Sequence, residues 1–161
     1  MNKQEVRRRI EDIGIIPSVR VSSTEDAMFA AEAVSRGGIP IVEIALTVPE
    51  AHKVIAHLAK NAPAVIVGAG SVFDVEAARR SLEAGAQFLT SDGLDVETVT
   101  FAAGGDVVMI PGTLTPTDVI AAWKMRPEFV KVVPCGNVGG ELHPESEGDV
   151  SQRAPDCRRA G

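Results

Sequence analysis

Short apolar runs rich in β-branched residues recur roughly every 20–25 residues along the chain. Between them lie alanine-rich stretches whose apolar positions have the spacing of an amphipathic helix. Strands and helices that alternate with short links predict parallel βαβ units. The six runs that we expect to be strands are 15–21, 39–45, 64–67, 88–90, 107–110 and 129–133.

Several of the predicted helices have recognisable first and last residues. A Ser, Thr or Asp side chain precedes three of them and glycine follows two, as is usual at helix ends. An amphipathic pattern within the first 14 residues predicts one more helix. The capping residues are Ser23 or Thr24, Asp74, and Thr115 before Pro116 at the starts, and Gly37, Gly38 and Gly85 at the ends.

Two architectures are built from such units, a doubly wound open sheet and a (β/α)8 barrel. A dinucleotide-binding open sheet would have a G-x-G-x-x-G motif after its first strand, but 15–23 contains no glycine. Gly68-Ala69-Gly70 follows the third run and lacks the last glycine of that motif. The even spacing favours an α/β fold of the (β/α)8 TIM-barrel type, present here as an incomplete barrel of about six βα units.

Polar residues inside or just after the strands are the candidates for chemistry, because barrel active sites lie at the carboxyl ends of the strands. Glu43 interrupts the second apolar run, and Lys131 interrupts the sixth. If the apolar neighbours of each residue pack against the helices, strand alternation directs both side chains into the barrel.

A buried acid and a buried lysine in one lumen have two explanations. They could form a structural ion pair, or they could be a Schiff-base lysine and its acid/base partner. Burial lowers the pKa of a lysine, which frees the lone pair that attacks a ketone, and it raises the pKa of a carboxylic acid toward neutrality.

Composition narrows the range of partners. The 161 residues are 45% hydrophobic and carry a net charge of −6, which argues against a nucleic-acid partner. No apolar run approaches the length of a membrane span. Cys135 and Cys157 are too few for a disulfide framework, which favours the cytoplasm. His52, His57 and His143 lack metal-ligand spacing, so we expect no metal site.

Six stretches occur in the order and at the spacing of one family: IIPSVR, GGIPIVEIALTVPEA, VGAGSV, AGAQFLTSDGLD, MIPGTLTPTDV and FVKVVP. In these the chain resembles the 2-keto-3-deoxy-6-phosphogluconate (KDPG) and 4-hydroxy-2-oxoglutarate (KHG) aldolases, class I lyases on a (β/α)8 barrel. The resemblance spans roughly residues 14–140. It implies cleavage of a 2-keto acid to pyruvate and an aldehyde, either glyceraldehyde 3-phosphate or glyoxylate.

The resemblance also implies roles for individual residues. Lys131, in FVKVVP, matches the lysine that forms a carbinolamine and then an imine with pyruvate. Glu43, in VEIAL, matches the general acid/base. Ser71 and the backbone of GAGSV beside it, including Gly70, would hold the pyruvate carboxylate. Arg20, in PSVR, matches a substrate-binding arginine.

Two positions depart from the usual family pattern. Thr47 stands where many members have arginine, so carboxylate binding would depend more on Ser71 and Arg20. Asp92 stands where the family usually has proline, which changes the shape expected for the pocket that holds the pyruvate methyl group.

The chemistry that the resemblance implies needs no cofactor. A protonated imine between Lys131 and the 2-keto carbon accepts the electrons of the breaking C3–C4 bond, and the resulting enamine is hydrolysed to release pyruvate. The implied partners are a small-molecule 2-keto acid and, as in the family, two further copies in a homotrimer. Another phosphate-binding barrel enzyme, or an inactive barrel fragment, is the alternative.

The chain after Gly140 is polar, lacks an apolar period and is unlike the family. Back-translation of this stretch with permitted codons and the first base dropped can give family-like sequence, although codon degeneracy leaves several choices. Shifted His143 yields only Ile or Thr, and shifted Asp149 only Thr or Met. We therefore expect a partial barrel domain over 1–140 and a frameshifted tail over 141–161, with a natural variant that has a disordered tail as the alternative.

A barrel that stops at six strands would have consequences for the site. The phosphate-binding loops that the resemblance implies would follow the seventh and eighth strands. The strand with Lys131 would have an unpaired edge, and water would weaken the nucleophile. From the sequence we expect a chain that folds poorly or aggregates and has little aldolase activity.

Overall fold

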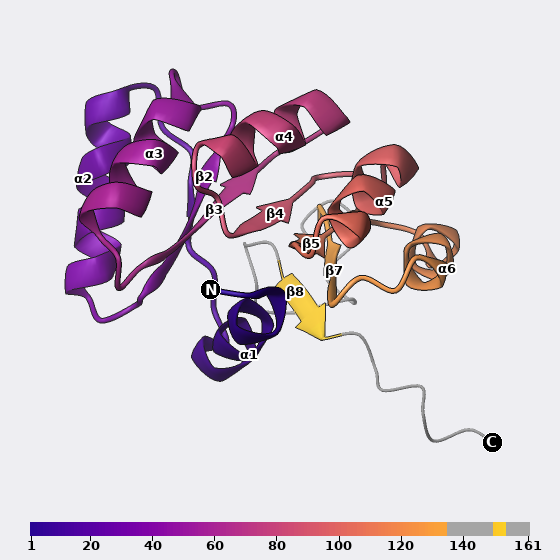
Figure 1. Ribbon diagram of the computed structural model, residues 1–161. Helices are drawn as coiled ribbons and strands as arrows, with labels where there is room; N and C mark the ends of the chain where they lie inside the picture. The colour runs from indigo at the N-terminus through magenta and orange to yellow at the C-terminus, as the bar shows by residue number, and fades with distance from the viewer. Residues whose placement is uncertain (135–149, 154–161) are drawn as a thin grey trace.

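A computed structural model of the chain describes residues 1–134 and 150–153 (Figure 1). Strands and helices alternate through these residues, as the apolar runs predict. The helices are α1 (Lys3–Ile13), α2 (Thr24–Arg36), α3 (Ala51–Asn61), α4 (Val75–Glu83), α5 (Val96–Gly104) and α6 (Pro116–Lys124). The strands are β1 (Ser18–Val19), β2 (Ile41–Ala45), β3 (Ile66–Gly70), β4 (Phe88–Thr90), β5 (Val108–Ile110), β6 (Gly112–Thr113), β7 (Phe129–Val132) and β8 (Val150–Arg153).

The parallel strands are neighbours in chain order, as in a (β/α)8 barrel. Strands β1 to β5 form one parallel sheet, and β6 pairs in parallel with β7. Only Pro111 separates β5 from β6, so one stretch of chain pairs first with β4 and then with β7. The backbone N–H of Lys131 donates to the Pro111 carbonyl at 2.9 Å, which links the two sheets. The fold is a partial barrel of the predicted α/β class.

The predicted capping residues begin the helices. The side chains of Ser23, Asp74 and Thr115 each accept a hydrogen bond from a backbone N–H in the first turn of the helix that follows. Gly14 ends α1 in the left-handed conformation, with φ of 74°, which glycine adopts without steric cost. The connections are therefore short and defined, and they fix the strand ends that carry the site.

The first residue of most strands lies in an apolar cluster inside the barrel. Helix α1 contributes to this cluster, so it covers the amino-terminal ends of the strands (Figure 1). Burial of this cluster stabilises the amino-terminal end of the barrel. Polar side chains can then occupy positions nearer the carboxyl ends of the strands. The cluster consists of Val6, Ile10, Ile41, Ile66, Phe88, Val108, Ile110 and Phe129.

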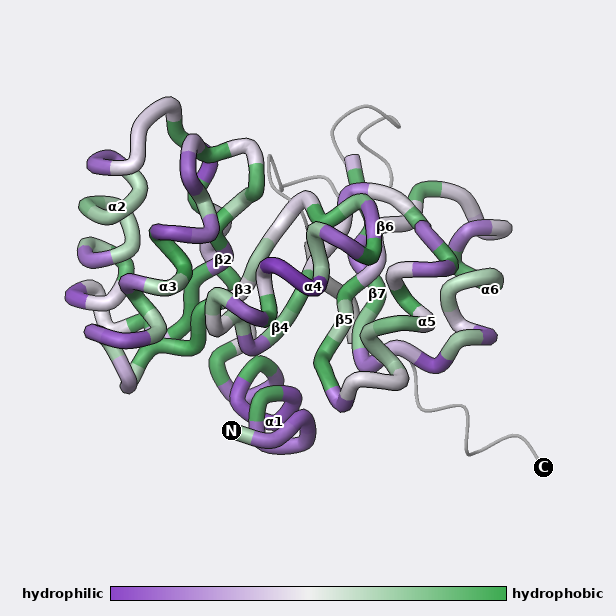
Figure 2. The backbone as a smooth tube through the Cα atoms, turned by 45° about the horizontal axis from the view of Figure 1, so that its top comes forward, coloured by the Kyte–Doolittle hydropathy of each residue, from purple (hydrophilic) through white to green (hydrophobic). Residues whose placement is uncertain are grey.

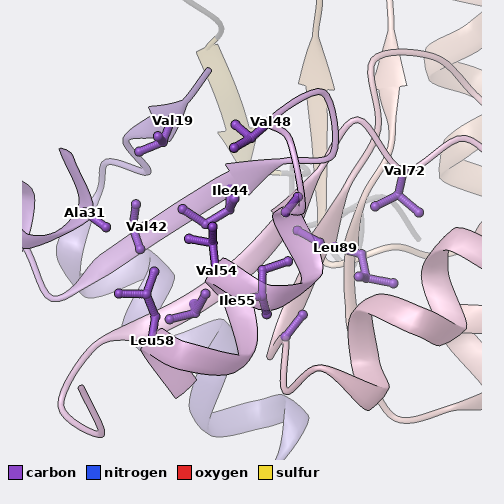
Figure 3. Packing of buried hydrophobic residues seen from close by; sticks show 14 of the residues in the cluster. Val19, Ala31, Val42, Ile44, Val48, Val54, Ile55, Leu58, Val72 and Leu89 are labelled. Carbon is purple, nitrogen blue, oxygen red and sulfur yellow. The ribbon is translucent and has the colours of Figure 1, made fainter. Parts of the chain in front are cut away.

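A second apolar cluster lies between the sheet and the outer helices. Val42 and Ile44 of β2 face Val54 and Ile55 of α3 (Figure 3). These residues of β2 are on either side of Glu43, so the prediction that Glu43 points the other way is confirmed. Hydrophobic positions follow the strands, and hydrophilic ones recur along the helices (Figure 2).

Some strand boundaries differ from the prediction. The first strand is Ser18–Val19 rather than 15–21. It begins only after Pro17, which has no backbone N–H to donate to a neighbouring strand. The third continues to Gly70, since its glycines pair with β2 although glycine is uncommon in strands. The two residues of β6 lie outside the strand expected at 107–110.

The expectation of an unpaired edge beside Lys131 is wrong. Strand β8 pairs antiparallel with β7, with Ser151 as the Cα partner of Lys131, and only 3% of Lys131 is exposed. Lys131 is therefore shielded from water, contrary to the expectation from the sequence. Most of the expected tail lies outside the described residues, as do Cys135, His143 and Cys157.

Candidate active site

Lys131 lies in β7 with its side chain almost fully buried. Its Nζ donates a hydrogen bond to Oδ1 of Asp92 at 2.8 Å. The backbone of β7 is held in register because Thr113 Oγ1 of β6 donates to the Lys131 carbonyl at 3.0 Å. A buried ammonium group needs such a partner, and the contact fixes where the amine points.

Asp92 is the residue on which several donors converge. Nη2 of Arg20 lies 3.1 Å from Oδ1 and 3.3 Å from Oδ2, and Ser71 Oγ donates to Oδ2 at 2.6 Å. Together with Lys131, these donors come from the ends of β1 and β3 and from β7. The sequence predicted all four as site residues, and the fold brings them together.

The contacts lower the pKa of the Asp92 carboxyl. Burial alone would raise it, but hydrogen bonds from Lys131, Ser71 and Arg20, and the charge of Lys131, outweigh burial and hold the pKa at about 2. Asp92 is therefore a carboxylate at neutral pH, paired with an ammonium and a guanidinium.

Glu43 is buried on the lumen side of β2, with 4% of the residue exposed. Its Oε1 accepts from Ser18 Oγ and its Oε2 from Thr90 Oγ1, both at 2.7 Å. Each carboxyl oxygen thus has a hydroxyl donor, Ser18 from the neighbouring strand β1 and Thr90 from β4, on the far side of β3. This arrangement fixes the orientation of a group that would carry protons.

Gly70 leaves the space that Glu43 occupies. A Cβ at this position would stand 2.1 Å from Oε1 of Glu43. The next residue, Ser71, has φ of 56°, which is unusual for a residue other than glycine. The turn at the end of β3 therefore accommodates the acid on one side and presents the Ser71 hydroxyl to Asp92 on the other.

Ser91 fixes the segment that carries Asp92. Its Oγ donates to the Gly93 carbonyl at 2.7 Å and accepts from the Gly112 N–H at 3.2 Å. A Cβ on Gly112 would stand 2.5 Å from the carbonyl carbon of Asp92. The backbone of this turn thus lies directly against β6.

Thr47 is the one predicted site residue that the described contacts do not connect to the others. It lies exposed in the turn after β2. Three residues that support the site were not predicted, namely Ser18, Thr90 and Ser91. Thr90 ends an expected strand and Ser91 follows it, so the criterion of polar residues at strand ends could have found both.

Other classes of site are not supported within the described part of the chain. It contains no group of three or more His, Cys, Asp or Glu side chains that could hold a metal ion. It also has no helix with the length and apolar character needed to cross a membrane. His52 and His57 lie on α3, which packs against the outer face of the sheet, whereas Lys131 and Glu43 are on the lumen side of the barrel.

The family model for KDPG and KHG aldolases matches residues 6–143. The chain belongs to this aldolase family. A 2-dehydro-3-deoxy-phosphogluconate aldolase from Treponema pallidum is 34% identical over 131 residues, which cover 81% of the chain and 62% of that relative. A KHG/KDPG aldolase from Escherichia coli is 32% identical over 126 residues, covering 78% of the chain and 59% of the relative. The chain thus spans less than two thirds of the length of both.

Solved aldolase structures share the fold. The 2-keto-3-deoxy-6-phosphogluconate aldolase of Zymomonas mobilis matches with a TM-score of 0.76 at 27% identity, covering 88% of the chain and 66% of that structure. A KDPG aldolase from Legionella pneumophila, solved with pyruvate captured as a covalent carbinolamine intermediate, matches with a TM-score of 0.66 at 29% identity. That match covers 71% of the chain and 56% of the structure.

Proposed function

We propose that the chain carries the imine-forming site of a class I aldolase that acts on 2-keto acids, with KDPG or KHG as substrate. The observation that carries the proposal is Lys131, a buried amine on a barrel strand, in a site that also has a buried carboxylic acid, Glu43. A structural ion pair between these two residues is not what the contacts describe. Lys131 contacts Asp92, while Glu43 accepts from two hydroxyl groups.

In the proposed reaction, Lys131 is the nucleophile. The ammonium form of Lys131 first loses a proton. The unprotonated Nζ then attacks C2 of the keto acid, and the carbinolamine loses water to give a protonated imine. The C3–C4 bond then breaks, and its electrons move into the enamine as the aldehyde leaves. Protonation of the enamine carbon and hydrolysis of the imine release pyruvate and regenerate the amine.

Glu43 is the proposed proton carrier. Formation and dehydration of the carbinolamine, and cleavage of the carbon–carbon bond, each require a proton to move at an oxygen of the substrate. The hydroxyl groups of Ser18 and Thr90 orient the Glu43 carboxyl for these transfers. Arg20, Ser71 and the turn at Gly70 are the proposed contacts for the substrate carboxylate, and Thr47 would contact the substrate from its exposed turn.

Reduction of the imine tests the proposal directly. The protein is incubated with pyruvate and sodium borohydride, and its intact mass is measured. We expect an adduct that is absent in Lys131→Met and retained in Lys60→Met, which changes an exposed lysine at the end of α3. An adduct that persists in Lys131→Met would contradict the assignment of the nucleophile.

We also propose the finer points that the family resemblance suggests: a homotrimer, a cytoplasmic location and a family-like part of the barrel domain that ends near Gly140. The end of the family match at residue 143 supports the last of these. Sedimentation velocity would test the trimer, for which we expect a species of three times the chain mass.

A further inference from the structure

The structure shows a carboxylate already bound by the donors of the site. Asp92 accepts from Lys131 at 2.8 Å, from Ser71 at 2.6 Å and from Arg20 at 3.1 and 3.3 Å. A guanidinium, an ammonium and a hydroxyl that converge on two oxygens form an arrangement suited to a carboxylate. These donors are thus arranged for an anion, and the anion that they hold is part of the chain.

The donors reach Asp92 from different parts of the barrel. Arg20 directly follows β1, Ser71 directly follows β3 and Lys131 lies in β7, whereas Asp92 is two residues beyond β4. Their side chains meet at the carboxyl ends of the strands, where barrel sites bind substrate. Asp92 therefore lies in the substrate region of the lumen.

The backbone of Asp92 is held in place, whereas its side chain is partly exposed to solvent. Ser91 ties the turn to Gly93 and Gly112 through hydrogen bonds of 2.7 and 3.2 Å, and the backbone lies against Gly112. The side chain itself is 23% exposed, and there is open space where a Cβ on Gly93 would stand. A change of side-chain rotamer would release the donors without moving the turn.

The charges of the site oppose an incoming anion while Asp92 is in place. Lys131 and Arg20 contribute two positive charges, and Asp92 and Glu43 contribute two negative charges when all four are ionised. A substrate carboxylate that entered this set would meet the Asp92 carboxylate, and like charges at close range repel. Among these four residues, removal of the Asp92 charge leaves a net positive charge.

We propose that Asp92 is a specificity-determining residue whose carboxylate competes with the carboxylate of a 2-keto acid for Arg20 and Ser71. Resting on the proposed function, this inference adds that a keto acid binds only after the Asp92 side chain is displaced. Carbonyl compounds without a carboxylate do not need Arg20 and Ser71, although they still need Lys131 as the nucleophile, so Asp92 reduces the preference of the site for keto acids.

Binding of oxamate tests the competition without any imine chemistry. Oxamate has the shape and charge of pyruvate, but its amide carbonyl is not attacked by an amine. We expect its dissociation constant, measured by titration calorimetry, to fall at least about fivefold in Asp92→Asn and in Asp92→Ser. Asp106→Asn is the matched control, because Asp106 is exposed before β5 at the opposite end of the barrel, with φ of 53° that asparagine tolerates.

Borohydride trapping with two carbonyl compounds separates this inference from the proposed function. In both Asp92 variants, the concentration that gives half-maximal trapping should fall further for pyruvate than for hydroxyacetone, which needs Lys131 but has no carboxylate to compete for Arg20 and Ser71. An equal fall for both compounds would overturn the inference, because Asp92 would then suppress the reactivity of Lys131 in general.

Each remaining outcome is also decisive. Unchanged or weaker oxamate binding in both Asp92 variants overturns the inference, whatever the trapping shows. Tighter oxamate binding, with no adduct from either compound in any variant, supports competition at a carboxylate site and contradicts the proposed aldolase function.

Discussion

Gly70 lies directly against Glu43, so that a Cβ added to the glycine would stand 2.1 Å from Oε1 of the acid. The ladder between β2 and β3 holds Gly70 opposite Ala45. The glycine cannot move away without breaking this pairing, and the acid is already held by Ser18 and Thr90. The absence of a side chain at position 70 is therefore a requirement of the site.

Gly70→Ala should slow imine formation at Lys131 and also lower the free energy of unfolding. The new methyl group would force the Glu43 side chain off its two hydroxyl donors, and overpacking of this kind costs about 1–3 kcal/mol. We expect the rate of borohydride trapping with pyruvate to fall by about 100-fold, the scale of a lost acid/base group. Gly104→Ala is the control, because nothing lies within 4 Å of a Cβ there and the residue ends α5.

Glu43→Gln should separate proton transfer from the shape of the pocket. The amide keeps the volume of the acid and one acceptor oxygen, but it cannot carry a proton between reaction steps. We expect the rate of imine formation with pyruvate to fall by about 100-fold or more, while the unfolding midpoint in urea changes little. Exposed Glu83 of α4 provides the matched Glu83→Gln control. An unchanged rate in Glu43→Gln would exclude Glu43 as the acid/base.

The alternation of apolar residues in the sequence was sufficient to predict that Glu43 and Lys131 lie on strands of the barrel. Phe88–Thr90 is a strand with the predicted bounds, and alternation about Val42 and Ile44 correctly directs Glu43 inward. Such predictions succeed because they depend on local geometry, in which side chains alternate along a strand.

The role of Asp92 could not be predicted in the same way. Its partners are 72, 39 and 21 residues away in the chain, so no local pattern links them. The family resemblance suggested that Asp92 changes the pocket for a methyl group, whereas the structure places it among the charged donors. Contacts of this kind depend on strand order and stagger, which a single sequence does not specify.

Because Asp92 is paired with Lys131 and Arg20, the free energy of unfolding should fall as the pH drops below about 4. Because the pKa of Asp92 is lowered from 3.8 to about 2, its ionised form stabilises the fold above about pH 4, and this contribution is lost as the pH falls toward 2. We expect wild type to exceed Asp92→Asn by roughly 1 kcal/mol at pH 6, after allowance for solvent screening, and by almost nothing at pH 2. Urea unfolding of both proteins across this range measures the difference, and the pKa values of Asp95 and Asp118, which are also lowered, cancel in the comparison. A constant difference between the two proteins across this range would contradict the pairing.

The antiparallel pairing of β8 with β7 should contribute to the burial of Lys131. Successive residues of a strand direct their N–H groups to opposite sides, so of Ser151 and Gln152 only one can donate to β7. Proline removes that donor. Ser151→Pro and Gln152→Pro should therefore differ in urea unfolding by about 1 kcal/mol, the net value of a backbone hydrogen bond. The less stable variant should also trap pyruvate more slowly, because water that reaches Lys131 restores solvation of the ammonium form. Equal stability and equal trapping in the two variants and in wild type would show that β8 does not protect the strand that carries the proposed nucleophile.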